Sequence, residues 1–125
     1  MRQRVLAILS LALGVTLTVF AATSPRWTQV PSREHVRSNP LAGRPEAAAA
    51  GAMVYREHCL QCHKADARGD GRKRPSLRSQ HLQSASDGDI EWFLRQGDLG
   101  RGMPSWSSLP EAQRWQVVAY LRSIQ

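Results

Sequence analysis

The feature that most constrains this chain is a five-residue motif near its middle, Cys59-Leu60-Gln61-Cys62-His63. Its pattern, C-x-x-C-H, is the attachment signature of c-type haem. Two thiols three positions apart, at the end of a helix, can reach the two vinyl groups on one edge of a porphyrin. The histidine that follows then lies under the iron. The motif predicts one covalently attached haem c per chain, held by Cys59 and Cys62, with His63 as an iron ligand.

Three other interpretations of the cysteine pair are open, namely a redox-active C-x-x-C, a disulfide and part of a zinc site. A thioredoxin-like motif needs a βαβ context, and no stretch of this chain alternates convincingly as a strand does. A disulfide that closes so small a loop would add little chain-entropy stabilisation. A zinc site needs further ligands, and the chain has no second cysteine pair beside its four histidines. Haem attachment is therefore favoured.

The first 22 residues have the pattern of an export segment. Arg2 and Arg4 precede an uncharged, mostly apolar run from Val5 to Ala22, and cleavage after Ala21 suits a signal peptidase. The run is also near the lower length limit of a membrane-spanning helix, roughly 17 to 25 residues. A signal peptide and an uncleaved membrane anchor over residues 1–22 both stay open. Either predicts a periplasmic or other extracytoplasmic location, with a possible tether through residues 5–22.

The rest of the chain divides into a linker and one domain. Residues 23–43 are rich in Pro, Ser, Thr, Asn and Arg and show no helical or strand periodicity, so we expect an extended linker or a surface strap. Residues 44–125 form the predicted domain. Its long loops contain several glycines and prolines, and loops of such length need something to wrap around.

Three main helices are predicted in this domain, which makes it all-α. The first begins at Pro45, a residue suited to a first helical turn, and runs to about His58. The second covers residues 89–96, with Ser86 or Asp87 as the N-cap and a glycine as the C-cap. The third starts from Ser108, where Ser-Leu-Pro-Glu matches a capping box, and continues to the end of the chain.

A six-coordinate electron carrier needs a second iron ligand opposite His63. Met103 is the favoured candidate, because Gly102-Met103-Pro104 is a loop that can present a thioether and that the proline would stiffen. His81 is the main alternative. The other candidates are in the linker or on the helix that leads into the motif, and they are His35, Met53 and His58.

On these residues the chain resembles the class I cytochromes c, in particular small bacterial mono-haem members, over roughly residues 44–125. Gly51 and Tyr55 stand eight and four positions before Cys59, where the family places a glycine and an aromatic residue on its first helix. Val117-Val118-Ala119-Tyr120-Leu121 is similar to the closing helix of the family. The resemblance implies that the two helices cross in close contact at Gly51.

The resemblance also implies a haem environment. The Pro75 carbonyl would accept a hydrogen bond from the iron-bound imidazole of His63, and Leu77 would pack on the haem face. Arg74 stands where a glycine is common in the family, which is a departure from its pattern. Gly102 to Trp106 is similar to the family's methionine loop. Trp106 would shield the haem edge or bond a propionate, with Trp92 as an alternative for either role.

The function implied is transfer of single electrons to and from redox proteins, within a periplasmic or membrane-associated chain. No catalytic base or nucleophile accompanies the haem motif, so the chain is not expected to be an enzyme by itself, although it could be the electron-accepting subunit of a dehydrogenase or a donor to a terminal oxidase. A haem enzyme or gas sensor with an open or labile sixth iron site is the alternative.

The charge balance bears on the partners. The formal net charge is +7, but the basic residues are scattered without interleaved aromatics, which argues against nucleic acid. A positive surface suits docking on acidic proteins. The densest basic segment follows the haem motif, where it is either a docking patch or a solvated loop, and it contains Arg68, Arg72, Lys73, Arg74 and Arg78.

Overall fold

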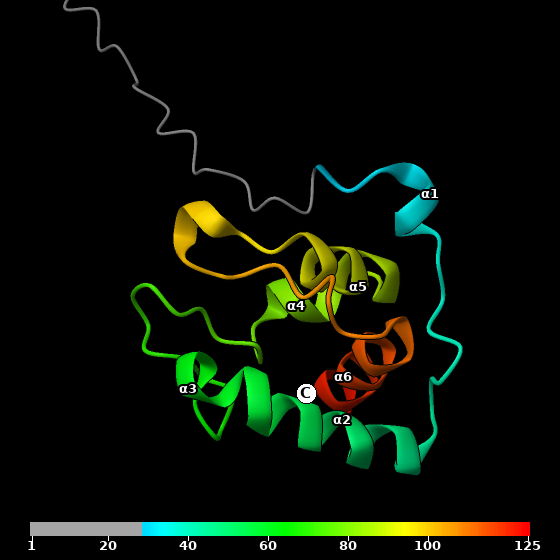
Figure 1. The fold of residues 1–125 in the computed structure, drawn as a ribbon, viewed down its shortest axis with the longest axis horizontal. Coiled ribbons are helices and arrows are strands. Elements are labelled where there is room, and N and C mark those ends of the chain that lie inside the picture. Colours follow the sequence, from blue (N-terminus) through cyan, green and yellow to red (C-terminus); the bar gives the residue numbers. More distant parts are fainter. Residues whose placement is uncertain (1–28) are drawn as a thin grey trace, which may run out of the picture.

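The computed structural model describes residues 29–125 and shows an all-α fold, as predicted (Figure 1). Within these residues there are six α-helices, one 3₁₀ helix and no strand. The elements are α1 (Ser32–His35), α2 (Pro45–His58), α3 (Leu60–His63), α4 (Gln80–Ser84), α5 (Asp87–Gln96), η2 (Leu99–Arg101) and α6 (Glu111–Ser123). The predicted export segment, residues 1–22, lies outside the described residues. No helix between residues 29 and 125 has the length and apolarity to cross a membrane.

The helices α2 and α6 make the most extensive helix–helix contact of the described chain. They cross at Gly51, where a Cβ would come within 1.9 Å of the carbonyl oxygen of Gln116. One turn further on, the rings of Tyr55 and Tyr120 pack with their centroids 5.1 Å apart. The close crossing expected from Gly51 is therefore confirmed.

The helix α5 packs on α6 and covers the other side of the core. It begins with a complete capping box, in which the Ser86 hydroxyl accepts from the Asp89 N–H and the Asp89 carboxylate accepts from the Ser86 N–H. Gly97 ends it with a positive φ of 69°. The helix predicted over residues 89–96 is confirmed, with Ser86 as its cap and a start two residues earlier. Its buried side chains Ile90 and Leu94 face the core.

The predicted start of the last helix is wrong. The helix α6 begins at Glu111 instead of following Ser108, and Pro110 is its N-cap, with no side-chain hydrogen bond. Proline disfavours helical backbone in the residue before it, so Leu109 cannot continue a helix from Ser108. The apparent capping box therefore spans a turn, in which the Leu109 N–H donates to the Trp106 carbonyl.

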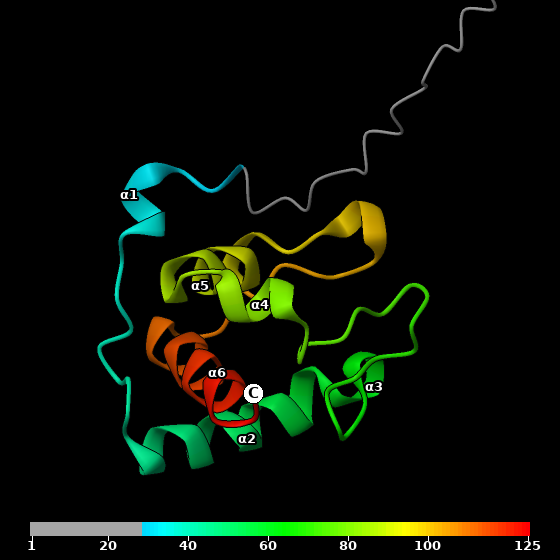
Figure 2. The ribbon, with the colours of Figure 1, turned by 180° about the vertical axis from the view of Figure 1, so that it is seen from behind.

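The segment before α2 is more structured than an extended linker. Residues 29–44, which we name the strap, contain the helix α1 and run along α5 and α6 (Figures 1 and 2). Gly88 of α5 touches it so closely that a Cβ there would lie 1.9 Å from the Glu34 carbonyl oxygen. The buried Asn39 side chain donates to the Trp115 carbonyl at 2.9 Å. No pattern in the sequence indicates the short helix at Ser32–His35.

Charged side chains bind the strap to both helices. Glu91 of α5 is fully buried, and its carboxylate lies 2.7 Å from Nε of Arg114 and 3.3 Å from Nη1 of Arg37. Glu34 of the strap accepts from Arg95 at 2.9 Å and from Arg37 at 3.2 Å. A buried charge is stable only when it is paired and hydrogen-bonded, and here each carboxylate has at least two cationic partners. The strap, α5 and α6 are thus joined by one network.

Candidate functional site

One cavity of about 280 Å³ lies between α2 and α3 on one side and α5, α6 and the loop after α5 on the other. It is close to the lower end of the range for cofactor pockets, roughly 300 to 1,000 Å³. Every site residue predicted from the sequence borders it, namely Cys59, Cys62, His63, Pro75, Leu77, Met103 and Trp106. Of the described residues considered as alternatives, His81 and Trp92 do not line it.

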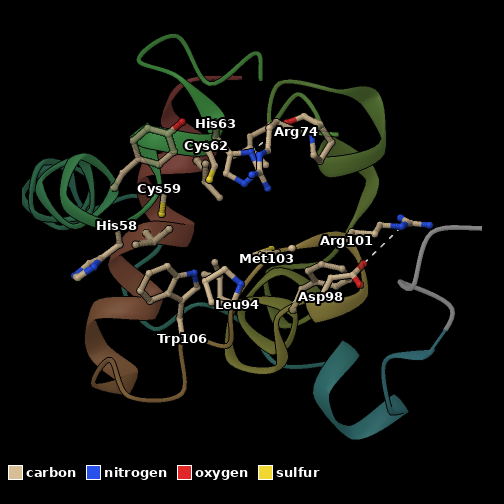
Figure 3. Close-up of a pocket in the computed structure, with 18 of the residues that line it drawn as sticks. His58, Cys59, Cys62, His63, Arg74, Leu94, Asp98, Arg101, Met103 and Trp106 are labelled. Carbon is tan, nitrogen blue, oxygen red and sulfur yellow. Dashed lines mark hydrogen bonds and ion pairs between the residues drawn. The ribbon is translucent and has the colours of Figure 1, made fainter. Parts of the chain in front are cut away.

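The cysteine motif is folded as a short helix set against the end of α2. Cys59 is the C-cap of α2, and α3 begins at the next residue. The N–H groups of Cys62 and His63 both donate to the Cys59 carbonyl, at 3.1 and 2.8 Å. Both cysteines and His63 therefore border the same cavity (Figure 3).

The environment of Cys59 does not suit a redox-active thiol. Burial, with a smaller effect of Cys62, raises the pKa of the Cys59 thiol to about 11. Reactive cysteines of C-x-x-C motifs have lowered pKa values, because the thiolate is the nucleophile. The two thiols are not joined by a disulfide. Among residues 29–125 no three or more His, Cys, Asp and Glu side chains gather into a group that could hold a metal ion.

The imidazole of His63 is oriented by the loop opposite it. Its Nδ1 lies 3.2 Å from the carbonyl oxygen of Pro75, which is the contact expected for these two residues. Burial lowers the pKa of His63 below its usual value. The hydrogen bond to the Pro75 carbonyl acts to raise this pKa, and the positive charge of Arg74 acts to lower it. The ring is therefore neutral near pH 7. Since Nδ1–H donates to the carbonyl, the lone pair is on Nε2.

The loop that carries Pro75 is tightly built. Asp70 accepts the backbone N–H groups of Arg72 and Arg74 on one carboxylate oxygen, each at 2.9 Å, and its own N–H donates to the Arg74 carbonyl at 3.0 Å. Gly69 has φ of +67°, and a Cβ there would lie 2.0 Å from that same carbonyl oxygen. These contacts therefore fix the backbone at Arg74, the position where a glycine is common in the family.

Met103 is held by the loop after α5. Its N–H and carbonyl exchange two hydrogen bonds with Asp98, at 2.9 and 2.8 Å, and η2 fills the turn between the two residues. Asp98 is buried at the base of this turn. Gly97 lies so close to Pro104 that a Cβ there would come within 2.6 Å of its backbone. In Figure 3 Met103 reaches the cavity from the wall opposite His63.

Trp106 and His58 pack together at the edge of the cavity, with ring centroids 5.0 Å apart. Figure 3 shows the indole beside the cysteine end of the cavity. The Trp106 N–H donates to the Leu94 carbonyl at 2.9 Å, so its backbone is fixed on α5. This position agrees with a tryptophan that shields a cofactor edge.

The donor set matches a covalently attached haem. Two thiols lie at one end, a neutral imidazole presents Nε2, and a thioether stands on the opposite wall. The remaining walls are largely apolar, which limits the access of water to a bound iron. These residues fit haem c, with Cys59 and Cys62 placed to attach it.

Residues 46–121 match the family described as cytochrome c oxidase, cbb3-type, subunit III. This is more than half of the chain. The chain belongs to this family. Comparison with curated proteins gives no match. Members are c-type cytochromes of class I, so this cytochrome transfers electrons through a covalently bound haem, and the family supports electron transfer rather than catalysis.

The sequence alone missed part of the cavity wall of this cytochrome. Arg74, Asp98 and Arg101 line it, together with Phe93. Asp98 had a local signal, because an Asp in the glycine-rich segment Gly97-Asp98-Leu99-Gly100 favours a turn. Arg74 had a weaker signal, its departure from the family's pattern.

Proposed function

We propose that the cytochrome is a mono-haem carrier of single electrons, in which Cys59 and Cys62 would attach the haem covalently and His63 and Met103 would bind its iron. The observation that carries the proposal is that all four side chains border one cavity, with His63 and Met103 on facing walls (Figure 3). When bound, haem c supplies a one-electron couple between ferric and ferrous iron.

The side chains of the chain set the properties of that couple. The Pro75 carbonyl fixes the His63 ring and increases its basicity. The thioether of Met103 favours the ferrous state and raises the reduction potential. Leu77 and Trp106 exclude water from the cavity. Electron transfer of this kind needs no proton relay, and the residues named here act by holding the ligand set unchanged in both oxidation states.

The wider setting is proposed from the sequence and the family. Residues 1–22 export or anchor the chain, residues 23–43 lead to the domain, and residues 44–125 form the cytochrome domain. The protein then works in the periplasm or at the outer face of the inner membrane. The family's description names an oxidase subunit, which favours a terminal oxidase as the electron acceptor. A periplasmic dehydrogenase is the other partner considered.

Acidic partners would dock beside the cavity. Arg72, Lys73 and Arg101 surround a second cleft that opens next to the first one. Arg72 and Lys73 are exposed, and no ion pair within residues 29–125 neutralises either. Arg72→Glu should weaken the dependence of the electron-transfer rate on salt, because fewer charges steer the encounter. The control is Arg44→Glu, an exposed arginine at the far end of α2, and equal salt slopes for both variants would contradict docking here.

The decisive experiment for the function is a visible spectrum of the exported protein in both oxidation states. We expect sharp reduced c-type bands and, in the ferric form, the weak far-red band that methionine sulfur gives to haem. Met103→Ala should remove the far-red band, whereas Met53→Ala, whose side chain is exposed on α2, should keep it. Haem bands without a far-red feature would instead favour the enzyme or gas sensor with an open sixth site. A colourless protein would contradict haem binding.

A further inference from the structure

Three cationic side chains lie on the cavity wall, and one of them has an unusual setting. Lys73 is exposed, and Arg101 is largely exposed and lies 3.8 Å from Asp98. Arg74 is partly buried, and no hydrogen bond or ion pair within residues 29–125 uses its guanidinium. The nearby Asp70 carboxylate feels the charge of Arg74 but forms no ion pair with its guanidinium. A partly desolvated arginine without a direct ionic partner is unfavourable, so this position suits an anion.

The side chain of Arg74 lies between the loop that contains Pro75, which orients His63 of α3, and the loop that carries Met103. Arg74 directly precedes Pro75, whose carbonyl accepts the hydrogen bond from Nδ1 of His63. Its Nη1 lies 3.4 Å from the place a Cβ would take on Gly102, the residue before Met103. In Figure 3 Arg74 lies beside His63, on the side of the imidazole away from the sulfur atoms of Cys59 and Cys62.

The structure of haem identifies the anion that would lie at this end of the cavity. The vinyl groups that thiols attack are on one edge of the porphyrin, and the two propionate carboxylates are on the opposite edge. A cofactor attached at Cys59 and Cys62 therefore directs its carboxylates toward the end where Arg74 lies. A guanidinium matches a carboxylate with two parallel N–H donors, which Lys73 cannot do.

We infer that Arg74 is the cation that binds a haem propionate, and that from there it links the Pro75 loop, which orients His63, to the loop that carries Met103. The inference rests on the proposed haem function and adds to it a specific positioning residue. The position is fixed in advance, because Asp70 holds the Arg74 backbone through both its N–H and its carbonyl. The neighbouring Arg72 shares the Asp70 contact at its N–H but does not line the cavity, which makes it a matched control.

The test compares haem-loaded Arg74→Gln, Arg74→Lys and Arg72→Gln with the unchanged protein by resonance Raman spectroscopy of the propionate bending mode. We expect Arg74→Gln to shift this mode, Arg74→Lys to shift it less, and Arg72→Gln to leave it unchanged. The reduction potential should fall more in Arg74→Gln than in Arg72→Gln, because an uncompensated carboxylate near the iron favours the ferric state. Equal spectra and equal potentials for the two Gln variants would overturn the inference.

Two further results distinguish a failure of this inference from a failure of the proposed function. If Arg74→Gln does not retain haem, the test is an NMR measurement on the unchanged protein in its ferrous form. We expect nuclear Overhauser contacts between the Arg74 guanidinium protons and the propionate methylenes. Their absence would overturn the inference. A protein that shows His–Met haem bands but no propionate effect would remove only this role of Arg74. A protein without haem bands would remove the proposed function itself.

Discussion

Gly51 of α2 and Gln116 of α6 meet so closely that a Cβ on the glycine would lie 1.9 Å from the Gln116 carbonyl oxygen. This crossing holds the helix that leads to the cysteine motif against the closing helix. Gly51→Ala should lower the free energy of unfolding by about 1 to 3 kcal/mol, because the methyl group meets backbone that no side-chain rotation can move. The measurement is denaturant unfolding of the haem-loaded protein.

The control for this crossing is Met53→Ala on the same helix. The Met53 side chain is 64% exposed, so its truncation should change stability by less than about 0.5 kcal/mol. A stable Gly51→Ala would contradict the crossing, since alanine has the higher intrinsic helix propensity.

The sequence predicted the parts of this cytochrome that local patterns encode. The helix of residues 45–58 was predicted from Pro45 and a run of alanines, and Ser86 was a candidate N-cap at the start of α5. The contact between His63 and Pro75 followed from the resemblance to a family, because nothing in the spacing of two loop residues dictates it.

The strap could not be predicted in the same way. Its helix α1 is four residues long, too short to leave a periodic pattern, and it is held by partners far along the chain. Glu34 meets Arg95, and Arg37 meets Glu91, across more than fifty positions. Interactions of that separation depend on tertiary packing, which composition and periodicity do not reveal.

The fully buried carboxylate of Glu91 should make Arg114 hard to replace. Arg114→Leu leaves the carboxylate without its nearest partner, at 2.7 Å in the unchanged protein, and should cost about 3 to 5 kcal/mol of unfolding free energy. The exposed Arg56 is the control, and Arg56→Leu should be within about 0.5 kcal/mol of the unchanged protein. The double variant Arg114→Leu/Glu91→Gln should lose less unfolding free energy than the two single variants lose together. Strict additivity would refute a direct pairing.

Acid should weaken the attachment of the strap. Burial acts to raise the pKa of Glu34, but Arg37, Arg95 and Arg33 outweigh it, and the pKa lies below its ordinary 4.5. A carboxylate with a lowered pKa stabilises the fold above its unfolded pKa and loses that effect as pH falls through the folded value. The free energy of unfolding should therefore decrease below pH 4.5, and Glu34→Gln should make that decrease shallower. Glu57→Gln, which changes an exposed carboxylate, should keep the slope of the unchanged protein.

The last prediction uses two glycines of the loop that orients His63. Gly69 and Gly71 both have positive φ, +67° and +69°, so a Cβ strains the backbone at either position. Only at Gly69 does the Cβ also meet the Arg74 carbonyl oxygen, at 2.0 Å, whereas nothing lies within 4 Å at Gly71. Gly69→Ala should displace the Arg74–Pro75 backbone and weaken the hydrogen bond that His63 donates.

A weaker bond to the Pro75 carbonyl makes the imidazole a poorer donor to iron, which disfavours the ferric state. The reduction potential of Gly69→Ala should therefore rise, while Gly71→Ala should lose a similar amount of stability from backbone strain and keep its potential. Potentiometric titration of both haem-loaded variants measures the difference. An equal potential in the two variants would mean that the loop does not control the His63 ring through Pro75.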